Sequence, residues 1–363
     1  MSNTEDIVLA VDYHDKNLVV RMYDLAVSQE QVIRAETTAA AIEALVKVAA
    51  RRAGPRGGRV VWVMESTTGW ARVKDLLGKR AEFVLANVLQ MPVPPKARRR
   101  KTDKIDTKRL LREYLNGPLP RAYQPPLSWR RLRRLVGARE SLVSRQTALR
   151  NWIDRYLAHE TWASRKGLWS DRGICRLRRF AERQEEPDRT VLSVKLDQLA
   201  EVGTHLDRLV EQIEGVCAAW LEARRLDEIF GIGAVSAVSI LARIGEVTRF
   251  GSAEQLISFA GLAPGIRQSD RTSREGHLGG GGTDKHLRHY LIEVSLWARK
   301  IPRYCPTYER ACRRRGKKIA RLVVARLLLR GIYKMLRDGV RFDPVGRRES
   351  ARRLERQLTA GGR

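Results

Sequence analysis

Four acidic residues in the first third of the chain have the types and spacing that hold divalent metal ions. Asp12 ends the apolar run DIVLAVD, and Glu65 stands near the end of a second apolar run, RVVWVMES. Asp103 and Asp106 are three residues apart in KTDKIDTKRL, a spacing that puts both on one face of a helix. Converging carboxylates repel one another unless a cation neutralises them, and all-oxygen ligand sets suit Mg2+ or Mn2+. We therefore predict a site for two such ions about 4 Å apart, which polarise a scissile phosphate.

Each of these acids has a simpler explanation when it is taken singly. An aspartate at a strand end is commonly a turn or cap residue, and Glu65 alone fits a loop acid. Asp103 fits the first turn of a helix, where the helix dipole stabilises a negative charge. The metal site is therefore a joint prediction, which depends on the order of the elements and on the basic surroundings.

Cations surround the second pair of acids. Five of the six residues from Lys96 to Lys101 are Lys or Arg, and Lys104, Lys108 and Arg109 follow. The whole chain of 363 residues has 70 Lys and Arg against 41 Asp and Glu, a net charge of +29. Such an excess favours a polyanionic partner, and nucleic acid is the first candidate. A generally arginine-rich protein without such a partner is the alternative.

A sheet is needed to bring the acids together. Hydrophobic patterning predicts the order β-β-β-α-β-α-β, with strands at 6–12, 17–24, 28–38, 59–66 and 81–88 and helices at 38–53 and 69–80. This order is an α/β layer, and we assign residues 1–125 to an RNase H-like metal-binding domain. In that fold the ends of the central strands lie side by side, and a later helix, here from 102 or 103 to 114, brings its acidic face beside them.

The rest of the chain is predicted to be mainly helical. Apolar stripes in 128–157 and 191–226 predict that two helices within 126–226 pack as an antiparallel hairpin or coiled coil, and such long helices are suited to dimerisation. Residues 227–342 form a C-terminal domain, in which EIFGIGAVSAVSILARIGEV resembles a helix-hairpin-helix element. Residues 266–300 are predicted to be a flexible basic loop that ends in a helix, and a basic amphipathic helix follows at 317–338. The tail at 343–363 is basic and is expected to be partly disordered.

Several classes of protein do not fit this sequence. No stretch approaches the ~18–20 apolar residues of a membrane span, and the start MSNTEDIVLAVDYHDK lacks the features of a signal peptide. His286 and His289 have no second pair of ligands, so we interpret them as structural or DNA-facing. The cysteines are scattered without zinc-site spacing, which favours reduced cytoplasmic thiols: Cys175, Cys217, Cys305 and Cys312.

From about residue 6 to 338, the chain resembles a known family. AVDYHDK, ESTTGW and KTDKIDTKRL resemble the acidic motifs of the DEDD-type insertion-sequence transposases that include the Piv DNA invertase. IFGIGAVSAVSILARIGEVTRFGSAEQLISFAGLAP and HLRHYLIEVSLWAR resemble the second half of the same family. The resemblance implies a bacterial, nucleoid-associated DNA recombinase with a RuvC-like domain, a coiled-coil middle and a C-terminal transposase domain. It also implies catalytic and metal-binding roles for Asp12, Glu65, Asp103 and Asp106.

The resemblance further implies a serine nucleophile shortly after the GLAP motif, at Ser269. Its hydroxyl would attack a DNA phosphate to give a phosphoserine link, which needs no ATP because the ester bond is kept. Arg267, Arg271 and Arg274 flank this serine and are suited to hold the phosphate oxygens. From the residues alone, the simpler interpretation is favoured, in which Ser269 is one polar residue in a basic loop.

The chain departs from the family pattern beside this serine. Asp270 follows Ser269 where the family usually has glycine, and LGGGGTDK replaces the family's usual downstream stretch. Ser273 is therefore an alternative nucleophile. Two other functions stay open: a metal-dependent RuvC-like nuclease or junction resolvase without serine chemistry, and a non-catalytic nucleic-acid-binding protein.

The family resemblance also implies the partners: double-stranded donor and target DNA, a structured non-coding guide RNA that bridges them, and further copies of the chain as a dimer or dimer of dimers. Basic residues are expected to dominate the affinity for nucleic acid and to make it salt-dependent. The expected contact residues are Arg98, Arg99, Arg100, Lys101, Lys104, Arg267, Arg271, Arg274, Lys285 and Arg288.

Overall fold

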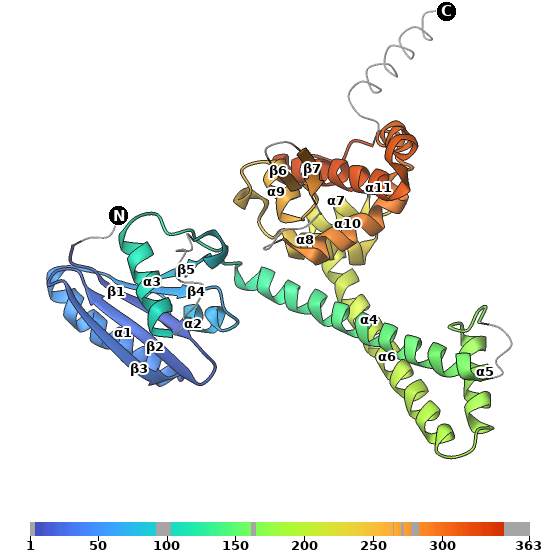
Figure 1. The fold of residues 1–363 in the computed structure, drawn as a ribbon, viewed down its shortest axis with the longest axis horizontal. Helices are drawn as coiled ribbons and strands as arrows, with labels where there is room; N and C mark the ends of the chain where they lie inside the picture. Colours follow the sequence, from blue (N-terminus) through green and yellow to red (C-terminus); the bar gives the residue numbers. More distant parts are fainter. Residues whose placement is uncertain are drawn as a thin grey trace, which may run out of the picture. The chain divides into compact units, whose positions relative to one another are not determined.

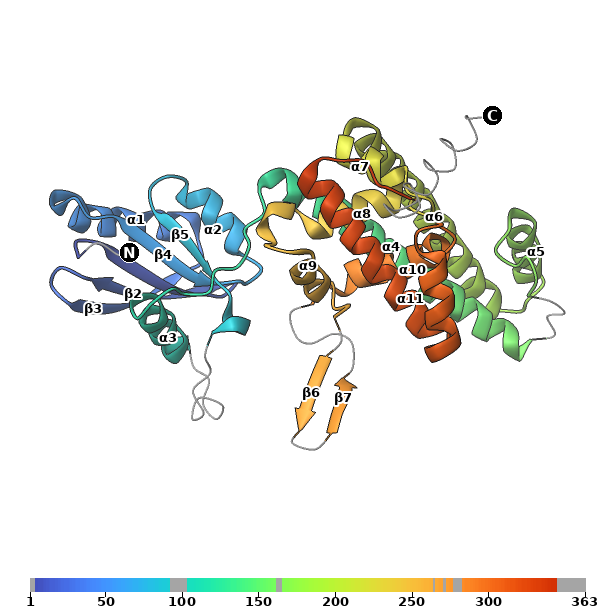
Figure 2. The same cartoon turned by 90° about the horizontal axis from the view of Figure 1, so that it is seen from above.

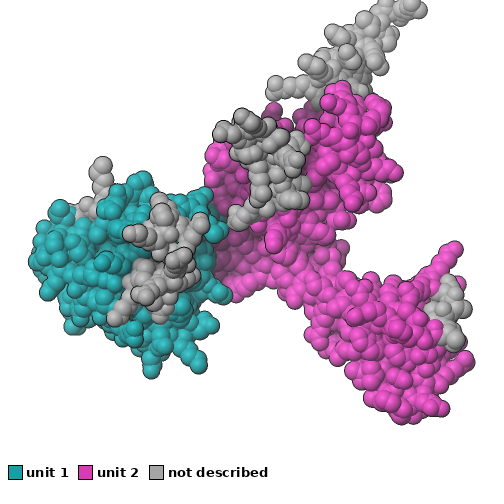
Figure 3. All heavy atoms as spheres, in the orientation of Figure 1, with its two compact units in different colours: residues 1–124 teal, residues 125–363 magenta. Residues whose placement is uncertain are grey.

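The structure, a computed structural model, describes residues 4–91, 103–160, 165–263, 265–269, 272–276 and 283–344. Side chains are described over the same ranges except at 103–106, 265–269 and 272–276. The chain divides into two compact units, Met1–Gln124 and Pro125–Arg363, which are coloured separately in Figure 3.

The first unit is built on a five-stranded sheet (Figure 1). The strands are β1 (Ile7–Tyr13), β2 (Asn17–Asp24), β3 (Gln29–Glu36), β4 (Val60–Glu65) and β5 (Glu82–Ala86). Their order is β3-β2-β1-β4-β5, with β1, β2 and β3 antiparallel and β1, β4 and β5 parallel. The predicted succession of strands and helices, and with it the mixed α/β class, is confirmed.

Helices cover both faces of this sheet (Figure 2). The helices α1 (Ala39–Ala53) and α2 (Trp70–Leu77) pack on the face that carries Ile7 and Leu9. The helix α3 (Asp103–Leu115) packs on the other face, where Leu110 and Leu111 join a separate apolar cluster. Burial on both faces explains why the central strands are almost continuously apolar, since successive side chains point to opposite sides.

The second unit begins with two long helices that pack against each other (Figure 1). They are α4 (Leu127–His159) and α6 (Asp188–Ala219), and α5 (Asp171–Glu182) packs at their far end. That end has its own apolar cluster, built from leucines such as Leu157, Leu177 and Leu192. The other end of the pair joins a larger cluster in the helical body that follows.

The helical body comprises α7 (Leu221–Asp227), α8 (Ala234–Ile244), α9 (Ala253–Phe259), α10 (Lys285–Ala298) and α11 (Cys305–Asp338). Two details differ from the sequence-based expectation. The basic segment expected to be a loop contains a two-stranded hairpin, β6 (Gly265–Ser269) and β7 (Thr272–Gly276). The last helix begins well before 317 and kinks at Gly316, whose φ of 82° is outside the helical range.

In the described part of the chain, no helix is long and apolar enough to cross a membrane.

Candidate metal and serine sites

The first two predicted carboxylates end neighbouring strands. β1 and β4 run parallel, and Val11 lies opposite Met64 in their register. The next residues in that register are Asp12 and Glu65, so the backbone places them next to each other at the carboxyl edge of the sheet. The register of two parallel strands therefore brings together two acidic residues that are 53 positions apart in the sequence.

Asp12 and Glu65 also belong to the face of the sheet that α3 covers. Side chains alternate along a strand, so Asp12 follows the face of Val8 and Glu65 follows the face of Val61. Both valines belong to the apolar cluster that contains Leu110 of α3. The two carboxylates therefore extend the α3 side of the sheet at its carboxyl edge.

The direction of α3 follows from the surroundings of Tyr114, near the end of that helix. Burial raises the pKa of Tyr114, and the nearby charges of Glu82 and Asp6 raise it further. Asp6 precedes β1 and Glu82 begins β5, so the end of α3 lies at the amino edge of the sheet. The beginning of α3, which holds Asp103 and Asp106, consequently points toward the carboxyl edge. The side chains of these two aspartates lie outside the described residues.

The immediate neighbours of Asp12 are His14 and Tyr13. The Asp12 side chain is 12% exposed, and its Oδ2 lies 3.2 Å from Nε2 of His14. The ring of Tyr13 packs against the turn that follows β4, because a Cβ built on Gly69 would lie 2.2 Å from the Tyr13 ring. Gly69 thus allows the turn after Glu65 to close onto the strand that carries Asp12.

The donor set fits a divalent metal ion by its chemistry. Asp12 and Glu65 supply carboxylate oxygens, the ligands that Mg2+ and Mn2+ prefer. Among the side chains that the structure describes, no three His, Cys, Asp or Glu residues gather closely enough to hold an ion. The predicted site also includes Asp103 and Asp106 at the start of α3, whose side chains lie outside the described residues.

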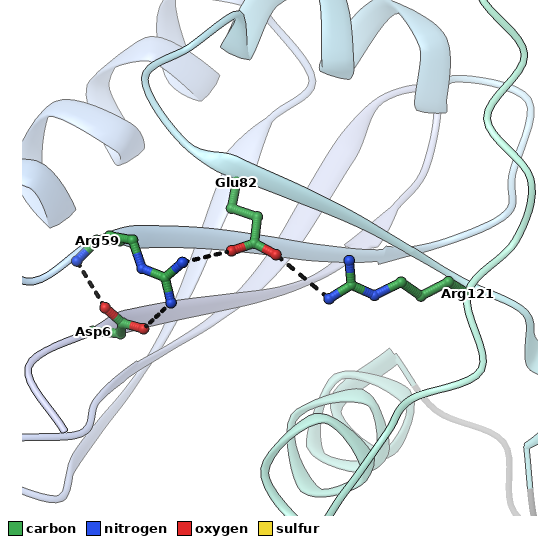
Figure 4. Close-up of polar contacts among 4 residues, drawn as sticks. All are labelled: Asp6, Arg59, Glu82 and Arg121. Carbon is green, nitrogen blue, oxygen red and sulfur yellow. Dashed lines mark hydrogen bonds and ion pairs between the residues drawn. The ribbon is translucent and has the colours of Figure 1, made fainter. Parts of the chain in front are cut away.

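Acids at the opposite edge of the sheet have a different environment (Figure 4). Asp6 is fully buried and accepts hydrogen bonds from Arg59, at 2.9 Å from the backbone nitrogen and 3.0 Å from Nη2. Glu82 accepts from the same guanidinium at 3.3 Å and from Arg121 at 3.5 Å. The hydrogen bond to Asp6 raises the pKa of Arg59. This network ties three strand ends together, and its carboxylates are neutralised by arginine, which suits a structural role.

The predicted nucleophile belongs to the β6–β7 hairpin, whose two strands are drawn in Figure 2. Ser269 is the last residue of β6 and pairs with Thr272, while Arg267 pairs with Arg274. Only two residues connect the strands, Asp270 and Arg271, and they lie outside the described residues, as do the side chains of β6 and β7. The register puts both candidate serines, Ser269 and Ser273, within one residue of the turn.

The described segments before and after this hairpin make contacts with the helical body. The backbone nitrogen of Asp284 donates to the carbonyl of Phe259 at 2.8 Å, which joins the chain after the hairpin to α9 before it. The Asp284 carboxylate caps α10 by accepting from the Leu287 nitrogen at 2.8 Å. Arg326 of α11 donates to the carbonyl of Leu262. The described segments on either side of the hairpin, up to residue 263 and from residue 283, are therefore held by the same helical body.

Two family models match the chain in separate stretches. A model for the DEDD transposase domain of IS110, described as "Transposase", matches residues 9–160. A model described as "Transposase IS116/IS110/IS902 family" matches residues 223–308. The chain belongs to the IS110 family of DEDD transposases. The first stretch contains all four predicted carboxylates of this IS110-family chain, and the second contains the β6–β7 hairpin with Ser269.

A curated relative is the "Insertion element IS110 uncharacterized 43.6 kDa protein" of Streptomyces coelicolor, which is 29% identical over 163 residues. The alignment covers 43% of this chain and 40% of the relative. The likeness thus spans about two fifths of that protein's length. The individual roles of the four carboxylates and the serine in this IS110-family chain remain predictions.

The other predicted nucleic-acid contacts of the IS110-family chain differ in whether the structure describes them and in how exposed they are. Arg98, Arg99, Arg100 and Lys101 lie outside the described residues, as does the side chain of Lys104. Lys285 is exposed at the start of α10, whereas Nη1 of Arg288 is buried beside Gly261 at the hairpin base. His286 is held by Glu140, with Nδ1 and Oε2 3.0 Å apart, which supports its structural interpretation.

The sequence interpretation missed His14, Tyr13 and Gly69, and only the glycine in ESTTGW signalled a close contact.

Proposed function

We propose that this chain is a DNA transposase that cuts and rejoins DNA through a covalent serine intermediate. The observation that carries the proposal is the parallel register of β1 and β4, which continues to Asp12 and Glu65. These two residues extend the sheet face on which α3 packs, and α3 begins with Asp103 and Asp106. The strand order is β3-β2-β1-β4-β5, in which β1, β2 and β3 are antiparallel and β1, β4 and β5 are parallel. This arrangement supports an RNase H-like first unit.

The proposed chemistry needs a nucleophile, an electrophile and a leaving group. The Ser269 hydroxyl attacks a DNA phosphorus, the new Oγ–P bond forms, and the bond from phosphorus to the 3′ oxygen breaks. The hydroxyl loses its proton and the departing 3′ oxygen gains one, so the strand is left with a free 3′ hydroxyl and a 5′-phosphoserine. Attack by a 3′ hydroxyl of the other duplex reverses the step and releases the serine, so that no external energy source is needed.

The carboxylates have a separate task in this proposal. Asp12, Glu65, Asp103 and Asp106 would hold Mg2+, or Mn2+ in its place, which when bound supplies a Lewis acid for the phosphate oxygens. The cross-strand pair Arg267 and Arg274 belongs to the same short hairpin as the serine, and guanidinium groups there are suited to bind the non-bridging oxygens. Donor and target duplexes, a structured bridging RNA and a dimer or dimer of dimers complete the proposal.

Replacement of Ser269 by alanine tests the covalent step. The S269A variant should leave no protein–DNA adduct after denaturation and should not exchange strands. The S273A variant should form the adduct and should exchange strands. The alternative, a metal-dependent nuclease, predicts that S269A cuts as the unaltered protein does. Cutting by S269A at the normal rate would therefore replace the serine mechanism with the nuclease.

Replacement of Asp12 by asparagine tests the metal site. The D12N variant should lose strand cleavage and should lose Mg2+-dependent thermal stabilisation, while its affinity for DNA is kept. A bound ligand stabilises the folded state by RT ln(1 + [L]/Kd), so the second readout does not depend on activity. If cleavage persisted in D12N, the carboxylate would be a turn residue and the site would be wrong.

A further inference from the structure

The tip formed by α5 and the turn before it carries a compact group of cations. We define the α5 tip as residues 165–183, at the end of α4 and α6 away from the helical body (Figure 1). Arg172, Arg176 and Arg179 are exposed and follow one another at intervals of four and three residues. At 100° per residue they share a sector of about 60° and span about 10 Å of one helix face. With Lys166, they line a shallow hollow of about 560 Å³.

The scaffold beneath this hollow is tightly built. The turn before α5 packs so closely that a Cβ on Gly173 would lie 2.2 Å from the carbonyl oxygens of Gly167 and Leu168. Ser170 caps α5 by accepting from the Gly173 nitrogen at 3.2 Å, and its hydroxyl donates to the Gly167 carbonyl at 2.6 Å. Leu168 and Leu177 are buried in the apolar cluster below. The cations are therefore held on a fixed surface, which lowers the entropic cost of binding.

Charge pairing distinguishes the two sides of α5. Arg178 forms an ion pair with Asp197 of α6, with nitrogen and oxygen 2.8 Å apart, so it serves the packing of the two helices. Neither Arg172 nor Arg179 has an acidic partner among the residues that the structure describes. A cluster of like charges raises the free energy of the folded chain unless an anion approaches it. The exposed side of α5 is thus suited to a ligand that carries regularly spaced negative charges.

We propose that the α5 tip binds the sugar-phosphate backbone of a double-helical stem of folded RNA. Val136 contacts the helical body and Leu157 contacts the tip, so about 30 Å of helix separates the tip from the helical body, whose chain includes the hairpin. This remoteness suits a scaffold partner rather than the DNA bond that reacts at the hairpin. The cations read phosphates rather than base edges, which is how double-helical RNA is mostly recognised. The inference rests on the proposed function only in that an RNA partner is part of it.

Affinity measurements on the full-length protein test this surface. The probe is a labelled RNA hairpin of arbitrary sequence, with a DNA hairpin of matching sequence beside it. The affected variant is R172A/R179A. The control is R145A/R208A, which removes the same charge from exposed positions on the shafts of α4 and α6.

The size of the effect follows from counterion release. With a slope of about 0.9 per phosphate contact, two contacts contribute about 60-fold to affinity at ~0.1 M salt relative to 1 M. R172A/R179A should therefore bind the RNA hairpin roughly 60-fold more weakly, with a salt slope lower by about 2, while the control changes little. Equal losses in both variants, or equal losses for RNA and DNA, would overturn the assignment to RNA at this tip.

Cys175 provides a second measurement at the same place. It is exposed and lines the hollow, whereas Cys217 is buried and Cys305 and Cys312 are partly buried elsewhere. At free RNA about ten times Kd, the unbound fraction falls about elevenfold, and alkylation of Cys175 should slow by that factor. Cys305 and Cys312 should react at unchanged rates. An unprotected Cys175 in a saturated complex would refute the proposal.

These outcomes are distinct from failure of the proposed function. Loss of RNA protection with normal strand exchange rejects the tip alone. Normal protection of Cys175 in a protein that never forms a DNA adduct rejects the serine chemistry alone.

Discussion

Replacement of Gly69 by alanine should disturb the carboxylate site through a single steric contact. The added Cβ would lie 2.2 Å from the Cε1 and Cζ atoms of Tyr13. Ordinary carbon contacts are at 3.5–4.0 Å, so the ring or the turn must move by about 1.3 Å. Gly69 has φ of −86°, a value that alanine adopts readily, so backbone strain does not contribute. The displacement is therefore purely a packing effect.

This displacement reaches the carboxylates from either side. If the ring moves, it pulls on β1 next to Asp12, and if the turn moves, it pulls on β4 next to Glu65. A misplacement of about 1 Å at a reacting centre costs on the order of 100-fold in rate. Overpacking of this kind costs about 1–3 kcal/mol of stability. We expect G69A to remain folded at 25 °C and to exchange DNA strands about 100-fold more slowly.

Single-turnover strand exchange with saturating DNA measures this effect, and thermal unfolding monitors the fold. Gly54→Ala is the matched control, because a Cβ at Gly54 meets no atom within 4 Å. The background variant Y13V removes the ring, so G69A should cost little when it is added to Y13V. If G69A kept the normal rate, or cost the same in both backgrounds, the contact with Tyr13 would not position the site.

Two further predictions concern contacts outside the site. The guanidinium of Arg56 holds the pKa of Asp24 below its ordinary value of about 3.9, so this pair stabilises the fold above that pH and stops doing so as pH falls through the lowered pKa. Urea unfolding should show R56A less stable than the unaltered protein at pH 7, and the difference should close in acid; a pH-independent difference would contradict the ion pair. Arg133 donates at 2.7 and 3.3 Å to two carbonyls in the last turn of α8, so R133A should lose about 2–3 kcal/mol while the exposed neighbour Arg134→Ala loses little; equal losses would rule out this cap.

Much of the first unit was predictable from local pattern. The strands β1 and β4 are buried on both faces, so their sequences are continuously apolar and end abruptly at a polar residue. The helix α1 was predictable for a related reason. Thr38 caps it by accepting from the Ala41 nitrogen, and the GPRGG segment follows its last residue. These signals are local, and each of them acts within one turn or one strand.

The features that the sequence interpretation missed depend on contacts between distant residues. Gly69 is close to Tyr13 only because β1 and β4 are neighbours, and no local pattern encodes that distance. The β6–β7 hairpin has a polar, arginine-rich sequence without alternation of apolar residues, so its pattern was typical of a loop. Pairing of its two strands across a two-residue connection, rather than a buried face, defines it.

The chemistry proposed for this chain is divided between two units with separate hydrophobic cores. Asp12 is positioned by the sheet of the first unit, and Ser269 by the hairpin on the helical body of the second. A variant in one unit should therefore leave the other intact, and the two defects can be combined.

If the site is shared between subunits, a mixture of D12N and S269A contains heterodimers in which one site is complete. In equal mixtures of a two-fold dimer, such sites number roughly a quarter of the normal total. Recovery of about that fraction of strand exchange indicates a shared site, whereas no recovery from a mixture shown to contain heterodimers means that each subunit supplies both groups of its own site.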